Sequence, residues 1–477
     1  MQARPLPSLA DAQAEFGRAY PEFEATHRLD ELRVTEYARL DRGGDVFLDY
    51  TAGGVYADSQ VRAHADLLTG GVFGNPHSTN RASLAMTEWV ERARACVLRY
   101  LNASSDEYVV CFTQNASGAL RLVGEAYPFT PEGRYLLTFD NHNSVNGIRE
   151  FARAKGARVT YAAVIPPDMR INDARLATYL EDVGTGSCSL LAYPAQSNFS
   201  GVQHSLDWIE RAHERGWDVL LDAAAFVPTN RLDLGRWHPD FVPISFYKII
   251  GYPTGVGALV ARKAALRKLH RPWFAGGTIT VASVAGDRHY MQEGAEAFED
   301  GTLDYLSLPA VEIGLRHIDG VGRDLIHTRV HCLTDWLLRA LASLRHENGE
   351  PVVQIYGPLD STDRGGTVAL NLYDSRGHFI DHRAVEGRAN DAGISLRTGC
   401  FCNPGGGEVA LGLSADELAS CFVRAPDRLA LDEFRRCIDD KSTGAVRVSL
   451  GLVTTFADVY RFVDFVSGFA DGNAAQT

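Results

Sequence analysis

Short apolar runs alternate with helical stretches between about residues 85 and 265 of the chain. Apolar runs of this length are typical of strands that are buried on both faces. Such strands, joined through helices, indicate a mainly parallel sheet covered by helices on either side. We therefore expect an α/β fold. The predicted strands are 108–112, 135–139, 158–161, 190–193, 217–222 and 240–246.

The remainder of the chain has a different pattern. Residues 307–344 lack strand signals and predict a long helix. Beyond it, 352–356, 367–372 and 446–450 alternate apolar and polar residues, which favours a smaller sheet with one exposed face. The expected organisation is an N-terminal segment packed on the small domain (1–47), a large domain (48–306), a bridging helix (307–344), a small C-terminal domain (345–471) and a frayed tail (472–477).

Composition narrows the class of protein. A chain of 477 residues that is 45% hydrophobic can bury more than one core. The net charge of −13 and the pI near 5.6 argue against nucleic acid or an anionic membrane as partners. No apolar run is long enough to span a bilayer, and the N-terminus lacks the apolar core of a signal peptide, so we expect a cytoplasmic protein. Eight dispersed cysteines without a CxxC pair indicate neither a disulfide framework nor a metal site.

Lys248 and Asp222 lie at the ends of two predicted strands. Lys248 follows the strand 240–246 and precedes a glycine-containing turn, so apolar surroundings should lower the pKa of its amine. A single lysine of this kind is most often a solvated surface residue, but Asp222 ends the strand 217–222. Pyridoxal phosphate requires an amine for its aldehyde and a carboxylate for its pyridinium nitrogen. The pair therefore predicts pyridoxal 5'-phosphate as cofactor.

Two further turns fit a cofactor that carries a phosphate. The turn that begins at Thr113 (Gln114, Asn115 and Ala116) lies between a predicted strand and a predicted helix, where backbone N–H groups and the helix dipole can meet a phosphate. An ordinary helix cap has a similar sequence. His142 follows the strand 135–139. Its imidazole could stack on an aromatic cofactor, or it could be a surface histidine.

Four segments carry a resemblance to a known family. They are the flanks of Lys248, YPAQSNFSG at 193–201, FEDGT at 298–302 and RTGCFCNPG at 397–405. Together they resemble the aminotransferase-like N-terminal region of molybdenum cofactor sulfurases and, more broadly, the class V aminotransferase and cysteine desulfurase superfamily. The resemblance covers about residues 48–465. It implies the fold of the type I pyridoxal phosphate enzymes, with a large domain and a smaller α/β domain.

The resemblance also implies roles for individual residues. Lys248 would bond the cofactor aldehyde, Asp222 would hold the pyridinium nitrogen, and His142 would stack on the ring and act as an acid or base. Asn198 would lie near the phenolic oxygen, and Ser245 would bind the phosphate together with the turn at Thr113. Thr302 matches a threonine that reaches the phosphate of a neighbouring subunit, which implies a homodimer. Arg447 matches the arginine that binds the substrate carboxylate through its planar fork, with Arg397 as a possible second group.

Cys402 matches the cysteine that carries the persulfide in this family. Its loop is polar and rich in glycine, so we expect a mobile segment that can reach both a substrate and an acceptor. The pair Cys400 and Cys402 is too closely spaced for an unstrained disulfide within one extended strand. The other cysteines are assigned no chemistry, because a single cysteine is more often a small buried hydrophobe. They are Cys96, Cys111, Cys188, Cys332, Cys421 and Cys437.

The sequence departs from the family pattern at three points. Gly407 stands where molybdenum cofactor sulfurases usually have a further cysteine, and we expect no molybdopterin-handling domain after the small domain. Ala225 stands where many desulfurases have a glutamine or another polar residue near the cofactor oxygen. The first two departures weaken the expectation of transfer to molybdenum cofactor in particular.

We expect an enzyme that moves sulfur from L-cysteine through a Cys402 persulfide to an unidentified acceptor and releases alanine. Another class V reaction (β-elimination at a C–S bond, epimerisation or transamination), with Cys402 a bystander, is the alternative. A non-catalytic scaffold that retains the cofactor fold is a third reading, which the intact set of Lys248, Asp222, His142 and Arg447 disfavours.

Overall fold

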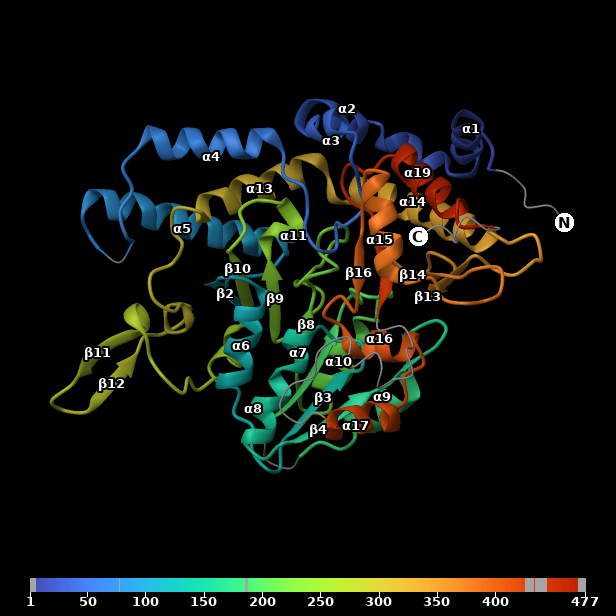
Figure 1. Cartoon of the computed structure of the whole chain (residues 1–477). Helices are drawn as coiled ribbons and strands as arrows, with labels where there is room; N and C mark the ends of the chain where they lie inside the picture. The colour runs from blue at the N-terminus through green and yellow to red at the C-terminus, as the bar shows by residue number, and fades with distance from the viewer. Residues whose placement is uncertain (1–5, 77, 185–187, 425–432, 434–443, 471–477) are drawn as a thin grey trace.

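The computed structural model describes residues 6–76, 78–184, 188–424, 433 and 444–470 (Figure 1). Its largest sheet has seven strands in the order β2-β10-β9-β8-β7-β3-β4. The neighbours from β9 to β4 pair in parallel, whereas β10 runs antiparallel to both β2 and β9. The predicted mainly parallel sheet is thus confirmed, although β10 was missed. The strands are β2 (Tyr108–Thr113), β3 (Arg134–Thr138), β4 (Arg158–Ala162), β7 (Ser189–Pro194), β8 (Trp217–Asp222), β9 (Phe241–Ser245) and β10 (Gly257–Arg262).

Both faces of this sheet are buried, which explains why its strands are unbroken apolar runs. Val219 packs into one hydrophobic cluster and the next residue of β8, Leu220, into another. Helix α10 (Asp207–His213) contacts β8 and contributes Trp208 to the first cluster. Helix α6 (Ala116–Ala126) lies against β9 and β10 and belongs to the second. The carboxyl ends of β3, β7, β8 and β9 therefore share one edge of the sheet.

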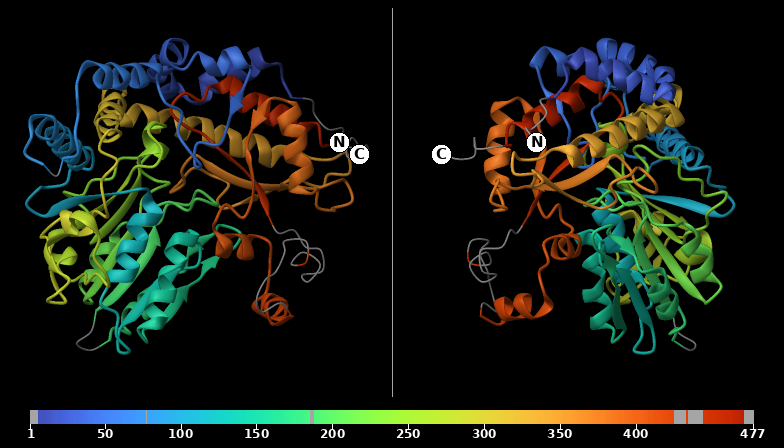
Figure 2. Two further views of the ribbon diagram at one scale, coloured as in Figure 1. Left: turned by 60° about the vertical axis from the view of Figure 1, so that its left-hand side comes forward. Right: turned by 90° about the vertical axis from the view of Figure 1, so that its right-hand side faces the viewer.

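The predicted long helix over 307–344 is two helices. They are α13 (Leu308–Val321) and α14 (Arg323–Ser343). Gly322 separates them with φ of +101°, a conformation that residues with a Cβ rarely adopt. Helix α13 packs on α4 (Asp58–Gly70) and α5 (Arg81–Tyr100), whereas α14 packs on α19 (Phe456–Ser467) near the C-terminus. The pair thus joins the two parts of the chain, as Figure 2 also shows.

The smaller sheet has four antiparallel strands in the order β13-β14-β17-β16. Its two central strands are buried at every position, so the prediction of one exposed face was wrong for them. The reason is a second packed layer: Val368 joins the main core, whereas its neighbour Ala369 packs with Phe199 and Phe401. The strands are β13 (Val353–Tyr356), β14 (Thr367–Leu372), β16 (Arg397–Gly399) and β17 (Ala445–Ser449).

The N-terminal helices lie beside the C-terminal helix α19 (Figures 1 and 2). Arg33 donates to Asp458 of α19 at 2.6 Å, and Arg329 of α14 donates to Asp30 at 2.6 Å. These contacts attach the N-terminal segment, which runs from α1 (Leu9–Ala19) through α3 (Arg39–Gly43), to the helices that cover the smaller sheet. The domain boundaries themselves stay predictions.

A further feature lies outside the predicted elements. A hairpin of β11 (Ile279–Ser283) and β12 (Arg288–Met291) projects from the large sheet's side of the molecule (Figure 1).

Among the helices that the structure describes, none combines the length and the apolarity that a membrane crossing requires. The other elements are α2 (Arg28–Glu36), β1 (Val46–Phe47), α7 (Asn143–Asn146), α8 (Ile148–Ala154), β5 (Val164–Ile165), β6 (Arg170–Ile171), α9 (Asp173–Leu180), α11 (Phe246–Ile250), α12 (Lys263–Leu266), α15 (His382–Asp391), β15 (Ile394–Ser395), α16 (Pro404–Ala410), α17 (Ala415–Arg424) and the 3-10 turns η1 (Pro21–Thr26), η2 (Gly276–Thr278) and η3 (Glu296–Phe298).

Candidate functional site

A cavity of about 370 Å³ lies at the carboxyl edge of the large sheet. Its walls come from the ends of β3, β7, β8 and β9 and from the start of α6, so segments far apart in the sequence meet there. Most of the predicted site residues line it. These are Lys248, Asp222, His142, Asn198, Ser245, Asn115 and Ala116, joined by Ala225 and by Gln196, which the sequence did not single out.

Lys248 lies in the short helix α11, directly after β9. Burial lowers the pKa of its amine below the usual value; Asp222 opposes this shift and the Arg447 guanidinium adds to it. The amine is therefore more readily deprotonated than that of a surface lysine, as predicted from the strand-end position. Gly251 ends α11 with φ of +72°, and its backbone lies so close to Tyr56 that a Cβ would collide with it.

Asp222 is the last residue of β8 and is buried. One of its carboxylate oxygens accepts a hydrogen bond from the Ala224 amide at 3.0 Å. The charge of Asp222 raises the pKa of both Lys248 and His142, so the carboxylate lies within electrostatic reach of both groups. Ala225 lies in the same wall and offers no polar side-chain atom to a ligand.

His142 caps the short helix α7 and lines the cavity, so it is not the solvated histidine that the sequence left open. Its Nδ1 accepts from the Ser144 amide at 3.1 Å. Burial lowers the pKa of His142 below its usual value, which keeps the ring neutral at pH 7. With Nδ1 as the acceptor, the proton of the neutral ring is at Nε2.

The turn before α6 lies at the cavity, next to Ser245. The Ala116 amide donates to Ser245 Oγ at 2.9 Å, and Asn115 Oδ1 accepts from the Gly118 amide at 2.9 Å. Strand β10 approaches closely at Gly257, where a Cβ would lie 2.6 Å from the Asn115 backbone. The first turn of an 11-residue helix thus meets the cavity beside a serine hydroxyl, which suits a phosphate.

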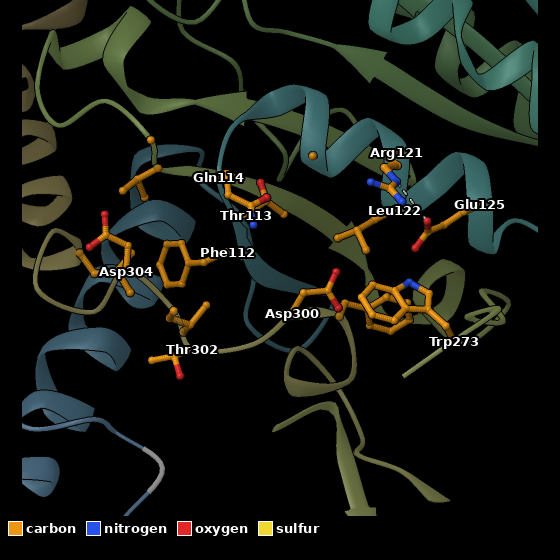
Figure 3. Close-up of a pocket in the computed structure, with 16 residues that line it drawn as sticks. Phe112, Thr113, Gln114, Arg121, Leu122, Glu125, Trp273, Asp300, Thr302 and Asp304 are labelled. Atoms are coloured by element: carbon orange, nitrogen blue, oxygen red, sulfur yellow. Dashed lines mark ion pairs between the residues drawn. The ribbon is translucent and has the colours of Figure 1, made fainter. Parts of the chain in front are cut away.

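Gln114 and Thr302 lie in a neighbouring cavity of about 410 Å³ and not in the one with Lys248 (Figure 3). Thr302 is exposed, and its Oγ1 accepts from Asn75 Nδ2 at 3.4 Å. Gly255 lines both cavities, so the two are adjacent. Within one subunit, the structure therefore does not bring Gln114 or Thr302 to the predicted cofactor site.

Arg447 is buried within the smaller sheet and faces the large domain. One terminal nitrogen donates to the Asn198 carbonyl at 2.9 Å, the other to Asp49 Oδ1 at 3.2 Å, and the guanidinium lies 4.7 Å from the centre of the Phe401 ring. Burial lowers the pKa of Arg447 to about 10, against the attraction of Asp49. Its Nε is buried without a partner in the described structure, so one donor of the guanidinium is uncommitted.

Arg397, the second candidate for the substrate carboxylate, is paired with Asp49. Its Nε and one terminal nitrogen contact Asp49 Oδ2 at 2.9 and 2.8 Å, while half of its side chain is exposed. Asp49 therefore holds both candidate substrate arginines. The sequence reasoning missed Asp49, although an acid directly after the apolar run Val46–Leu48 was a signal that could have found it.

Cys402 lies in a tight turn beside the cavity. It is an exposed, free thiol, and its carbonyl accepts from the Asn143 amide at 2.7 Å. The predicted glycine-rich loop is instead a helix from Pro404 onward, α16, which Asn403 caps. The glycines allow close packing: a Cβ at Gly405 would collide with the carbonyl of Phe139.

Most of the remaining cysteines are buried, as expected for small hydrophobes. Burial raises the pKa of Cys96, Cys111 and Cys188, which disfavours their thiolates. Cys332 is also buried. Cys421 is buried but forms a disulfide, so the prediction that it carries no chemistry was wrong. Cys437 lies outside the described residues. Cys400 is an exposed free thiol like Cys402.

Comparison with known proteins identifies the family. Residues 46–462 match the family described as aminotransferase class V. The chain is 38% identical to molybdenum cofactor sulfurase of Solanum lycopersicum, covering 95% of this chain and 58% of that protein, and 36% identical to the human protein, covering 92% and 51%. It thus spans roughly half to three fifths of the length of these relatives.

The fold matches that of solved cysteine desulfurases. The apo enzyme of Thermococcus onnurineus NA1 superposes with a TM-score of 0.73 at 21% identity, covering 91% of this chain and 96% of that one. This agreement confirms the expected fold of the type I pyridoxal phosphate enzymes, with its large parallel sheet and smaller second sheet. The chain belongs to the aminotransferase class V family.

Proposed function

We propose that this protein is a pyridoxal phosphate enzyme that moves sulfur from L-cysteine to an acceptor through a persulfide on Cys402, releasing alanine. The observation that carries the proposal is the docking of the Cys402 turn against the Lys248 cavity. The Asn143 amide, next to His142, bonds the Cys402 carbonyl, and Asn198 Nδ2 bonds the Phe401 carbonyl at 2.7 Å. The turn that carries the Cys402 thiol thus adjoins the cavity that Lys248 and Asp222 line, which supports the proposal.

The residues present fit pyridoxal phosphate. Asp222 would bind the pyridinium nitrogen, Lys248 would bond the aldehyde, and the start of α6 with Ser245 would hold the phosphate. Asn198 would lie at the phenolic oxygen, and His142 would stack on the ring. When bound, the cofactor would draw electrons from the substrate Cα and so make its proton acidic.

The chain's own groups would perform the remaining work. Lys248 would accept the Cα proton, since its amine is readily deprotonated. Arg447 would bind the substrate carboxylate through its fork, which requires it to share or exchange Asp49. The Cys402 thiolate would attack the substrate sulfur: a bond forms between the two sulfur atoms, the Cβ–S bond breaks, and the carbon that loses sulfur takes a proton to give alanine.

One observation favours the alternative, another class V reaction such as β-elimination at a C–S bond. Cys402 lies beside the cavity and is not part of its lining. In that reaction Cys402 would be a bystander, and Lys248, Asp222 and Arg447 would keep their roles. A scaffold without turnover is disfavoured, because Lys248 and Asp222 line one cavity and the Arg447 guanidinium lies within electrostatic reach of Lys248.

We further propose a cytoplasmic homodimer. The exposure of Thr302 and the open cavity that it shares with Gln114 support a role for both residues toward a second subunit (Figure 3). The acidic net charge supports a small-molecule substrate rather than nucleic acid or a membrane as partner.

Product analysis tests the proposed function. Protein reconstituted with pyridoxal phosphate should convert L-cysteine to alanine in the presence of a thiol reductant, and Lys248→Ala should form none. Borohydride should fix the cofactor covalently to the wild-type protein and not to Lys248→Ala. Pyruvate and ammonia in place of alanine would support β-elimination, and failure to bind pyridoxal phosphate would refute both enzymatic readings.

A further inference from the structure

The turn that carries Cys402 has an uncommon backbone conformation. Phe401 and Cys402 both have φ of +55°, in the left-handed region that residues with a Cβ rarely adopt. The Asn403 amide donates to the Cys400 carbonyl at 2.9 Å and closes the turn. Such conformations persist only where the surroundings fix them, and they gather at functional sites. We therefore ask which contacts hold this turn beside the candidate site.

Asn403 is the residue on which these contacts converge. Its side chain is fully buried. Its Nδ2 donates to the Asp140 carbonyl at 2.7 Å and to Asn198 Oδ1 at 2.9 Å, while its Oδ1 accepts from the Gly406 amide at 2.9 Å. One amide thus joins the Cys402 turn to the segment before His142, to the Asn198 turn and to helix α16.

A second set of bonds holds the backbone beside Asn403. The Asn143 amide donates to the Cys402 carbonyl at 2.7 Å, and Asn198 Nδ2 donates to the Phe401 carbonyl at 2.7 Å. Both donors belong to segments that line or adjoin the Lys248 cavity. A negative charge at Cys402 also raises the pKa of Lys248 and of Arg447, so the thiolate lies within electrostatic reach of both cations.

We infer that Asn403 is a positioning residue that holds the Cys402 thiol beside the Lys248 cavity in the orientation that sulfur transfer requires; this rests on the proposed function. Asn403 acts through Cys402 and does not itself contact the substrate. The arginine that would bind the carboxylate is held separately, because Arg447 bonds the main-chain oxygen of Asn198 and not its side chain. Loss of Asn403 should therefore slow sulfur transfer and spare carboxylate binding.

Two substitutions remove the hydrogen bonds that Asn403 Nδ2 donates and keep the side-chain oxygen that caps α16. Asn403→Ser and Asn403→Asp both retain an oxygen that can accept from Gly406, since serine and aspartate are good N-caps. Both lack the Nδ2 donor to Asp140 and Asn198. Asn172→Asp is the matched control, because Asn172 caps α9 in the same way, through the Arg175 amide at 3.0 Å, and lies on another segment of the large domain.

Both Asn403 variants should form the Cys402 persulfide about ten- to a hundredfold more slowly, because a displacement of about 1 Å can cost a hundredfold in rate. Their KM for L-cysteine and their cofactor content should match those of the wild type. Hydrogen exchange at the amides of Asn143 and of residues 399–403 should be faster, without any substrate present. Asn172→Asp should leave the rate, KM and this exchange unchanged.

Three results would overturn the inference. They are wild-type rates in both Asn403 variants, wild-type hydrogen exchange at Asn143 and residues 399–403, and an increase in KM that matches the loss of rate, as general damage to the site would give. The proposed function fails in a different way: the wild-type protein itself would then form no persulfide from L-cysteine. If the wild type forms persulfide and the variants match it, only the inference about Asn403 is wrong.

Discussion

Arg447 shares a single carboxylate, that of Asp49, with a second arginine. Arg447 is buried and donates to Asp49 Oδ1 at 3.2 Å, whereas the half-exposed Arg397 forms a two-point contact with the same group. The two guanidiniums carry one more positive charge than Asp49 neutralises. This surplus charge, and an Arg447 Nε that has no partner among the described residues, support the proposal that a substrate carboxylate binds here.

Asp49→Asn should destabilise the protein by about 3 kcal/mol, because it leaves a buried guanidinium without its counter-charge. Arg397→Met removes the other partner of Asp49, but at the half-exposed side of the cluster. Its cost should be at most about 1 kcal/mol. Urea unfolding of the cofactor-free protein measures both. Equal costs for the two variants would show that Asp49 does not serve mainly to stabilise Arg447.

Arg447→Ala should weaken binding of an amino-acid substrate about ten- to a hundredfold, since a bidentate charged contact contributes about 1.5–3 kcal/mol. Arg447→Lys should restore only part of the affinity, because an ammonium cannot form the planar fork. The spectral change of the bound cofactor on titration with L-cysteine reports the affinity, and the cofactor content is the control. Unaltered affinity in Arg447→Ala would place the carboxylate elsewhere.

Gly405→Ala should destabilise the protein by about 1–3 kcal/mol, because the added Cβ collides with the carbonyl of Phe139, a backbone atom that cannot turn away. Gly407→Ala is the matched control on the same helix. Its Cβ would meet the Phe199 ring at 3.8 Å, an ordinary contact, and alanine favours the helix by about 0.5–1 kcal/mol. In thermal unfolding, the melting temperature of Gly405→Ala should therefore lie well below that of the wild type. The melting temperature of Gly407→Ala should equal or exceed that of the wild type. The reverse order would contradict the packing of α16.

The stability of the cofactor-free protein should depend on the protonation of Lys248. Its folded-state pKa is lowered by burial, so the unfolded chain binds the proton more tightly. Holding the charged amine in the folded protein therefore lowers the free energy of unfolding, and this cost is fully present below the folded-state pKa. It decreases as the pH rises toward the unfolded value of about 10.4. Lys248→Met should accordingly be more stable than the wild type at pH 7, by a margin that narrows toward pH 10. A constant margin across that range in urea unfolding would show that Lys248 is not a buried base.

The sequence predicted those features that depend on local periodicity. Strands that are buried on both faces leave apolar runs, and in parallel sheets the residues after them share one edge, so Lys248, Asp222 and His142 could be placed together in advance. Helix α6 could be placed because a strand and a polar turn precede it. Strand β10 was missed although Gly257–Arg262 is an apolar run like the others. Its antiparallel direction could not be predicted, since nothing in its own residues specifies the direction of its neighbours.

Features that depend on contacts between distant segments could not be predicted. The partner of Arg447 lies almost 400 residues earlier in the chain, at Asp49. The glycines after Cys402 indicated flexibility, because their sequence does not reveal that the backbone of Phe139 packs against Gly405. The role of Asn403 likewise follows from oxygen atoms on two other turns.

The central claim is that sulfur passes from cysteine to Cys402. The most direct measurement is mass spectrometry of the intact cofactor-loaded protein and its peptides after a single turnover with L-cysteine that carries a heavy sulfur isotope. The peptide that contains Cys402 should gain one labelled sulfur atom, with alanine formed in equal amount. Cys402→Ser should bind cysteine but gain no label, because a hydroxyl is scarcely ionised at neutral pH. Alanine formed at the wild-type rate by Cys402→Ser, or label on Cys400 alone, would contradict the account.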